Sequence, residues 1–150
     1  MNGWYALIAA LVGWLIAQTW KTVAGVVADR KQIKKMGLAA LIGYVTRSGG
    51  MPSGHAASMS ALTVCLGLGE GFGSGVFALS LAMTLIVIYD AIHVRYAVGV
   101  QGMALNRMLE KEGEKPLPIA EGHTLAQVVV GMIIGVVVGI ITSAIVGILV

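Results

Sequence analysis

A polar, glycine-rich loop carries the residues best suited to chemistry in this chain. Arg47 stands at one end and His55 at the other, with Ser53 and Gly54 directly before the histidine. An apolar segment follows, so the loop leads into the N-terminus of a helix. A guanidinium, a hydroxyl and the free N–H groups of a helix N-terminus suit a phosphate, although Ser53 can also cap the helix. We expect the loop to bind phosphate, with His55 as general acid or base because imidazole titrates near neutral pH.

A second group of polar residues, Asp90, His93 and Arg95, stands at the C-terminal end of a later apolar segment. On a helix Asp90 and His93 share a face, so the carboxylate is placed to orient the imidazole. Alternatively, Asp90 and Arg95 form a structural ion pair. The spacing matches no metal-binding motif, so no metal site is predicted. Lys21, near the end of the first apolar segment, either contacts a phosphate or extends to the membrane interface.

His123 follows Glu121 and Gly122 directly before the last apolar segment, so it also stands at a helix entrance. Two histidines on one face of a membrane offer a nucleophile and a general acid for phosphoryl transfer through a phosphohistidine. Arginine and lysine side chains would stabilise the charge on the equatorial phosphate oxygens. His55 and His123 are therefore predicted to act together.

Composition indicates an integral membrane protein. Apolar residues make up 57% of the 150 residues and charged residues 11%, whereas a soluble domain carries roughly 25% charge. The length allows one domain, residues 1–150. The net charge of +3 suits a membrane surface and phosphate groups rather than nucleic acid. A single cysteine, Cys65, excludes an internal disulfide.

The pattern of apolar segments predicts an all-α membrane fold. Segment 37–46 is too short to span a bilayer and is predicted to be a re-entrant half-helix. Segment 94–110 is predicted to be an amphipathic helix. About four membrane-spanning helices are predicted from the remaining apolar segments, which are residues 3–28, 55–68, 76–92 and 124–150.

Counting membrane crossings places the polar groups on one face. Two spans and one tight turn separate the loop 47–55 from the polar region 93–123, so both lie on the same side. If 37–46 is re-entrant, the basic loop 30–35 joins them, and the positive-inside rule makes this side cytoplasmic. If 37–46 spans fully, the basic residues divide between the two faces. We prefer the first topology, in a bacterial inner (plasma) membrane.

Two segments resemble motifs of a known superfamily. Residues 51–55, Met-Pro-Ser-Gly-His, resemble the second signature motif of the type 2 phosphatidic acid phosphatases, a superfamily that includes the vanadium haloperoxidases. Residues 122–131 are similar to the third motif, in which a nucleophilic histidine is followed four residues later by aspartate. Together with residues 89–95, Tyr-Asp-Ala-Ile-His-Val-Arg, they resemble a divergent branch of this superfamily.

The resemblance implies a helical membrane enzyme that removes phosphate from a lipid without a metal or another cofactor. His123 would be the nucleophile and His55 the acid that protonates the leaving oxygen. The residues that would hold the phosphate are Arg47, Ser53, Gly54 and Arg95, with Lys21 in place of the lysine of the first motif.

The chain departs from the superfamily pattern at three places. The lysine-to-Arg-Pro spacing of the first motif is absent, and Arg95 lies far upstream of His123 instead of just before it. Gln127 occupies the position of the aspartate that orients the nucleophile, so Asp90 or Glu121 is expected to supply a carboxylate.

Two functions fit these residues. One is a phosphatase for a phospholipid of the phosphatidylglycerophosphate or phosphatidic acid type. The alternative is a non-catalytic membrane module that binds or translocates phospholipid headgroups. Glycine-rich surfaces on the first and last spans further suggest a homodimer.

Overall fold

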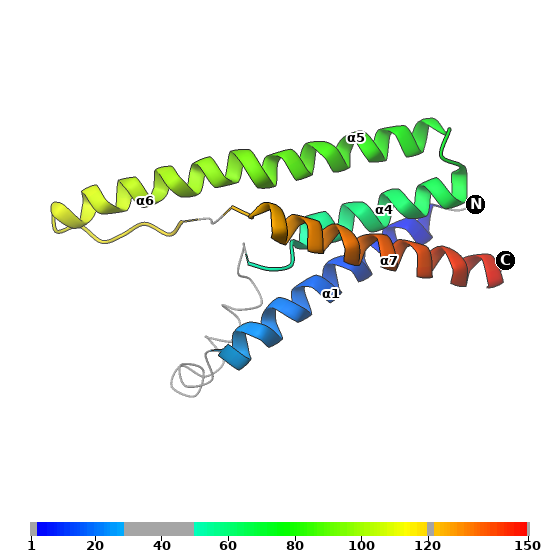
Figure 1. Cartoon of the computed structure of the whole chain (residues 1–150), viewed down its shortest axis with the longest axis horizontal. Helices are drawn as coiled ribbons and strands as arrows, with labels where there is room; N and C mark the ends of the chain where they lie inside the picture. The colour runs from blue at the N-terminus through cyan, green and yellow to red at the C-terminus, as the bar shows by residue number, and fades with distance from the viewer. Residues whose placement is uncertain (1–2, 29–49, 120–121, 150) are drawn as a thin grey trace.

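The computed structural model describes residues 3–28, 50–119 and 122–149, and the regular elements in these ranges are all helical (Figure 1). Arg47, Glu121, the basic loop 30–35 and the predicted half-helix 37–46 lie outside the described residues. The elements, in chain order, are α1 (Trp4–Ala28), α4 (Gly54–Glu70), α5 (Gly75–Tyr89), the π-helical turn η1 (Asp90–Val94), α6 (Arg95–Lys111) and α7 (Leu125–Leu149).

Three helices are long and apolar enough to cross a membrane. They are Trp4–Ala28, the continuous helix Gly75–Lys111 formed by α5, η1 and α6, and Leu125–Gly147. The fourth predicted span, α4, has 17 residues, or about 26 Å of helix against a bilayer core of about 30 Å. The predicted helical architecture is therefore confirmed in the described residues, and a count of four spans stays a prediction.

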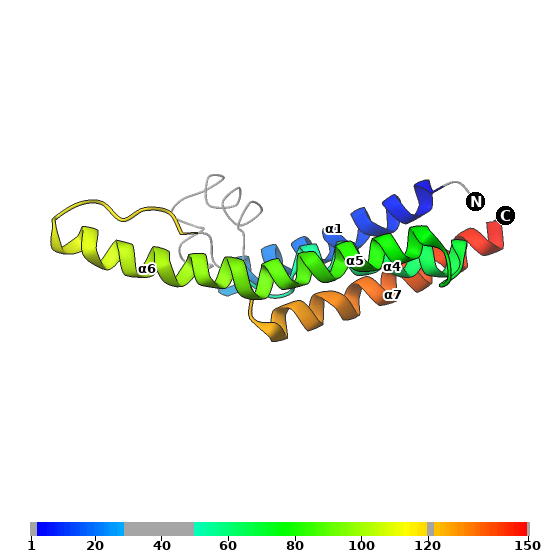
Figure 2. The same ribbon diagram turned by 90° about the horizontal axis from the view of Figure 1, so that it is seen from above.

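Helix α4 lies at the centre of the bundle. It packs against α1, α5 and α7, and α1 also contacts α7. Figure 2 shows α1 and α7 on opposite sides of α4 and α5. The helices alternate in direction, so the first turns of α4 and α7 and the α5–η1 junction lie at one end of the bundle, and α1 runs toward the same end while diverging from α5 and α7 (Figure 1). We call this the polar end, and α6 continues beyond it.

Glycines bring the helix backbones into direct contact. A Cβ atom on Gly135 of α7 would collide with the carbonyl oxygen of Ala57 in α4, and one on Gly13 of α1 would lie 3.0 Å from the same oxygen. One turn before Gly135, Gly131 lies against the carbonyl oxygen of Ser53. One turn after it, Gly139 lies against the carbonyl oxygen of Ala61. Small residues at this spacing permit close packing of membrane helices. These glycines of the first and last spans thus pack against α4 of the same chain.

Hydroxyl groups join α4 to α5 in the interior. The hydroxyl oxygens of Thr63 and Thr84 lie 2.8 Å apart, and both threonines are buried. Thr84 also donates to the carbonyl of Ser80, at 2.9 Å. These bonds satisfy polar groups that no water reaches, and they fix the register between α4 and the start of the long helix.

We predict that Gly135→Ala destabilises the fold, because the added methyl group has to separate α7 from α4. Overpacking of this kind typically destabilises by about 1–3 kcal/mol. Thermal unfolding in detergent measures the change. Gly147→Ala is the matched control, since Gly147 lies in the same helix with nothing within 4 Å of an added Cβ. Equal unfolding temperatures for both variants would contradict the backbone contact.

Candidate functional site

The predicted phosphate loop ends in the capped N-terminus of α4. The Ser53 hydroxyl accepts a hydrogen bond from the Ala56 N–H at 3.4 Å, and Ser53 is completely buried. Of the two roles that the sequence suggested for Ser53, phosphate binding and helix capping, the structure shows the helix cap. A Cβ on Gly54 would lie 3.2 Å from the Trp14 indole, so α1 closes over this turn. His55, in the first turn, is exposed.

The α5–α6 junction is a π-helical turn, which the sequence did not predict. Within it the backbone N–H of Arg95 donates to the Asp90 carbonyl, five residues earlier. The same turn brings the two side chains together, and Nε of Arg95 donates to Oδ2 of Asp90 at 2.7 Å. The ion-pair alternative for Asp90 is the one observed. His93 instead stacks on Tyr89, with ring centroids 4.3 Å apart.

The π-turn also anchors the predicted nucleophile. In an α-helix the carbonyl of Ala91 would accept from the N–H of Arg95, but the π-turn redirects that donor to Asp90. The Ala91 carbonyl accepts from the His123 N–H, at 3.2 Å. A Cβ on Gly122 would collide with the backbone nitrogen of Tyr96, so only glycine permits this approach. His123 is held against the helix junction and is 5% exposed.

Gln127 contacts His123 from the first turn of α7. Its Oε1 atom lies 3.2 Å from Nδ1 of His123 and accepts from the Thr124 N–H at 3.1 Å. Thr124 Oγ1 in turn accepts from the Gln127 N–H at 3.4 Å. This reciprocal pair is a capping box, and its sequence signature, Thr-x-x-Gln, was available in the sequence. The Gln127 carbonyl also accepts from the N–H of Ser53, at 2.9 Å, which ties the phosphate loop to α7.

The predicted residues converge electrostatically at the polar end. Burial is the main cause that lowers the pKa of His123, and the hydrogen bond with Gln127 opposes it. The positive charges of Lys21, His55 and Arg95 lower this pKa further. Lys21 also lies beside the loop, because a Cβ on Gly50 would be 3.8 Å from its Cδ. Lys21, His55, Arg95 and His123 thus influence one another electrostatically, and the Asp90 carboxylate also acts on His55. We call these four residues the cationic cluster.

Exposed aromatic side chains mark both ends of the bundle. Trp4 (73% exposed) and Phe72 (62%) lie at the end opposite the cluster, and Trp20 (65%) and Tyr89 (61%) lie beside it. Trp4 and Trp20 are about 24 Å apart along α1. Amphipathic aromatic rings favour the two membrane interfaces. Lys21 directly follows Trp20 in the sequence.

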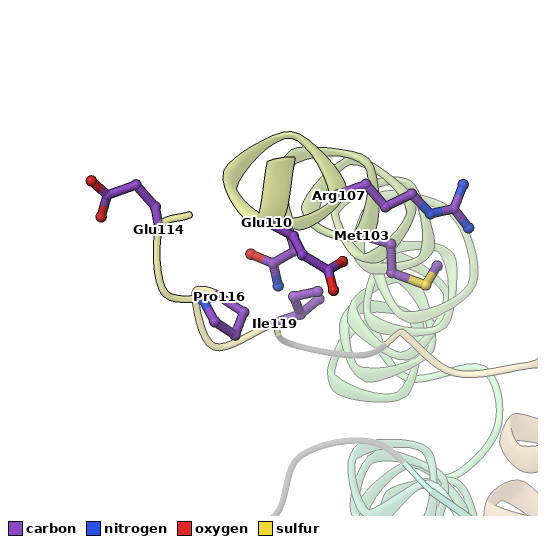
Figure 3. Close-up of a pocket in the computed structure, with 7 residues that line it drawn as sticks. Met103, Arg107, Glu110, Glu114, Pro116 and Ile119 are labelled. Carbon is purple, nitrogen blue, oxygen red and sulfur yellow. The ribbon is translucent and has the colours of Figure 1, made fainter. Parts of the chain in front are cut away.

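Two adjoining cavities lie on the outer side of the cluster, between α6 and the segment that returns to α7. The first, of about 250 Å³, reaches the cluster. The second, of about 340 Å³, lies farther out (Figure 3) and shares Met103 and Ile119 with the first. Asn106 holds the returning segment through two hydrogen bonds to the Leu117 backbone, at 2.9 and 2.8 Å. The first cavity is lined by Tyr96, Gly99, Val100, Met103, Ile119, Gly122, His123 and Thr124.

Metal binding finds no support in the described ranges. Among residues 3–28, 50–119 and 122–149, no three His, Cys, Asp or Glu side chains are grouped so as to hold a metal ion. The cluster instead offers imidazoles, an ammonium and a guanidinium, which suit an anion.

Comparison with known proteins identifies the family. The model of the Divergent PAP2 family matches residues 4–138, a range that contains the whole cluster. The chain belongs to the Divergent PAP2 family. The resemblance seen in the sequence is thus confirmed. The chain is also similar to the uncharacterized membrane protein YuiD of Bacillus subtilis (strain 168), which is 28% identical over 148 residues, covering 87% of this chain and 89% of that protein. No solved structure matches the chain.

We predict that the three histidines differ in their reaction with diethyl pyrocarbonate, which modifies accessible neutral imidazoles. His55 and His93 are exposed and should react first, whereas buried His123 should react last. Mass spectrometry of modified peptides measures the order. Gly122→Ala should accelerate the modification of His123, because the added methyl group pushes the chain off the Tyr96 backbone. Early modification of His123 in the unaltered protein would contradict its burial.

Proposed function

We propose that this protein is a metal-independent phosphatase for membrane lipid phosphates of the phosphatidylglycerophosphate or phosphatidic acid type. The observation that carries the proposal is the mutual electrostatic influence of His55, His123, Lys21 and Arg95 at the polar end of the bundle. Membership of the Divergent PAP2 family supports phosphatase-related chemistry at these residues. Nucleophile, acid and phosphate-binding cations are then all present in one place.

The proposed reaction proceeds in two steps. His123 Nε2 attacks the phosphorus and forms the N–P bond while the P–O ester bond breaks, and protonated His55 gives its proton to the leaving alcohol oxygen. A water molecule then attacks the phosphohistidine, the N–P bond breaks, and His55 takes the proton of the water. The products are the lipid alcohol and inorganic phosphate, and His55 is protonated again.

Phosphate binding in this proposal is shared among helix termini and cations. The first-turn N–H groups at Gly54, with Lys21 and Arg95, bind the phosphoryl oxygens, and Arg47 joins them from outside the described residues. Asp90 holds the Arg95 guanidinium through one N–H, which leaves the other donors for the phosphate. The Ser53 hydroxyl is completely buried and caps α4, so its part in this proposal is to hold the first turn that presents these N–H groups.

The location of the cluster supports a lipid substrate. Trp20 and Tyr89, exposed aromatic residues of the kind that favour a membrane interface, lie beside the cluster, which supports a substrate whose phosphate stays at the bilayer surface. The preferred topology assigns this face to the cytoplasmic side of an inner membrane, where such phospholipid phosphates are made.

A second candidate function is a non-catalytic module that binds or translocates phospholipid headgroups. Gln127 favours it, because a carboxylate is absent from the position that orients the nucleophile in the superfamily. The same cationic cluster would then bind a headgroup without cleaving it.

Phosphate release from purified protein distinguishes the two functions. We expect release from phosphatidylglycerophosphate or phosphatidic acid without added metal. We expect a loss of about 10²–10⁴-fold in His55→Ala, the range of general acid–base catalysis, and no release from His123→Ala. Exposed Gln101→Ala is the control and should retain activity. Unchanged release in both histidine variants would refute the mechanism, and no release from any lipid phosphate would favour the headgroup-binding module.

Thiol labelling tests the orientation in the membrane. Glu112→Cys places a thiol beyond α6 on the side of the cluster, and Gly73→Cys places one in the turn at the opposite end. The native thiol, Cys65, is buried and should not react. In intact cells an impermeant maleimide should label Gly73→Cys and leave Glu112→Cys unlabelled. The reverse pattern would overturn the cytoplasmic assignment.

A further inference from the structure

One oxygen atom in the cluster has two neighbours that determine its chemistry. Oε1 of Gln127 lies 3.1 Å from the backbone nitrogen of Thr124 and 3.2 Å from Nδ1 of His123. A backbone N–H can only donate, so the amide atom facing Thr124 has to be the oxygen rather than the NH₂ group. The orientation of the Gln127 amide is therefore fixed by the helix cap and does not depend on the histidine.

The fixed oxygen in turn selects the protonation state of the imidazole. A carbonyl oxygen only accepts, so its contact with Nδ1 is a hydrogen bond only when Nδ1 carries the proton. In the neutral ring the proton is then absent from Nε2, which keeps its lone pair. The opposite tautomer would place two lone pairs against each other at 3.2 Å.

Backbone contacts hold both partners of this hydrogen bond. The His123 N–H donates to the Ala91 carbonyl of the π-turn, and the Gln127 carbonyl accepts from the N–H of Ser53. The ring and the amide are thus tied to two different helices before any substrate binds. Such support keeps a reacting group within the narrow tolerance that catalysis requires.

We propose that Gln127 is a positioning residue that holds His123 as the neutral Nδ1–H tautomer, so that the site has a nucleophilic Nε2 without an orienting carboxylate from any described residue. The carboxylate of Asp90, which the sequence offered as a substitute, is paired with Arg95. Among the described residues, the charged groups that act on His123 are Lys21 from α1, His55 from α4 and Arg95 from α6. These groups favour a neutral ring, and Gln127 determines which nitrogen of that ring is free.

The catalytic meaning of this inference rests on the proposed phosphatase function, but the tautomer itself does not. A capping role alone would also explain Gln127, because Oε1 satisfies the Thr124 N–H. Gln127→Glu separates the two roles. It retains the side-chain length and an acceptor for Thr124, and it changes only the charge beside Nδ1. Gln127→Leu keeps a similar volume and removes the acceptor.

The experiment is ¹⁵N NMR of histidine-labelled protein in detergent, with the His123 signals assigned by their loss in His123→Gln. The unaltered protein should show a protonated Nδ1 and a bare Nε2. In Gln127→Leu the ratio of the Nδ1–H to the Nε2–H tautomer should fall about fivefold, as expected for one hydrogen bond. In Gln127→Glu the tautomer should persist and the pKa of His123 should rise by about one unit or more. Gln101→Glu on the exposed face of α6 is the charge control and should change neither quantity.

Two results would overturn the inference: an Nε2–H tautomer in the unaltered protein, or the same tautomer ratio in the unaltered protein and Gln127→Leu. If Gln127→Leu fails to fold, an unchanged pKa of His123 in Gln127→Glu would likewise overturn the inference. Phosphate release measured on the same samples separates the two proposals. The expected tautomer without any phosphate release would remove the phosphatase and leave the role of Gln127 in orienting the ring. Phosphate release together with an Nε2–H tautomer would support the phosphatase and remove the proposed role of Gln127.

Discussion

The direct contact between the backbones of α4 and α7 determines most of the remaining structure. Gly131, Gly135 and Gly139 provide no side chain to separate the two helices, so α7 lies directly against α4 from the Ser53 cap onward. Packing at this distance places the Gln127 carbonyl within 2.9 Å of the Ser53 N–H. The two helix entrances that carry His55 and His123 are consequently joined before any side-chain chemistry is considered.

The π-turn has a comparable influence on the other side of the cluster. One additional residue in that turn redirects a backbone donor, which frees a carbonyl for His123 and aligns Arg95 with Asp90. The ion pair is partly exposed, so its contribution to stability is about 1 kcal/mol or less. Its effect is to orient a guanidinium beside the cluster. Turns of this kind are frequent at functional sites.

Much of the architecture was predictable because hydrophobic length and crossing number are properties of the sequence. The observed ends of α1, α4, α6 and α7 lie within about two residues of the predicted ends. Different definitions of a helix end differ by about the same amount. Counting crossings also placed His55, Arg95 and His123 at one end. The Asp90–Arg95 ion pair was one of the two alternatives that the spacing offered. The π-turn and the contact of the Ala91 carbonyl with His123 were not predictable, because they depend on how segments distant in the sequence pack together. The capping box at Thr124 was predictable from its spacing and was overlooked.

The long helix Gly75–Lys111 has a mechanical consequence. Its 37 residues form a rod of about 55 Å, of which roughly the last 25 Å extend beyond the bundle. A change of 10° in the tilt of such a rod moves its outer tip by about 4 Å. The returning segment contacts this rod at three places: Leu117 bonds to Asn106, Gly122 lies against Tyr96, and His123 bonds to Ala91. A change in the tilt of this helix would therefore be transmitted through these contacts to the backbone around His123.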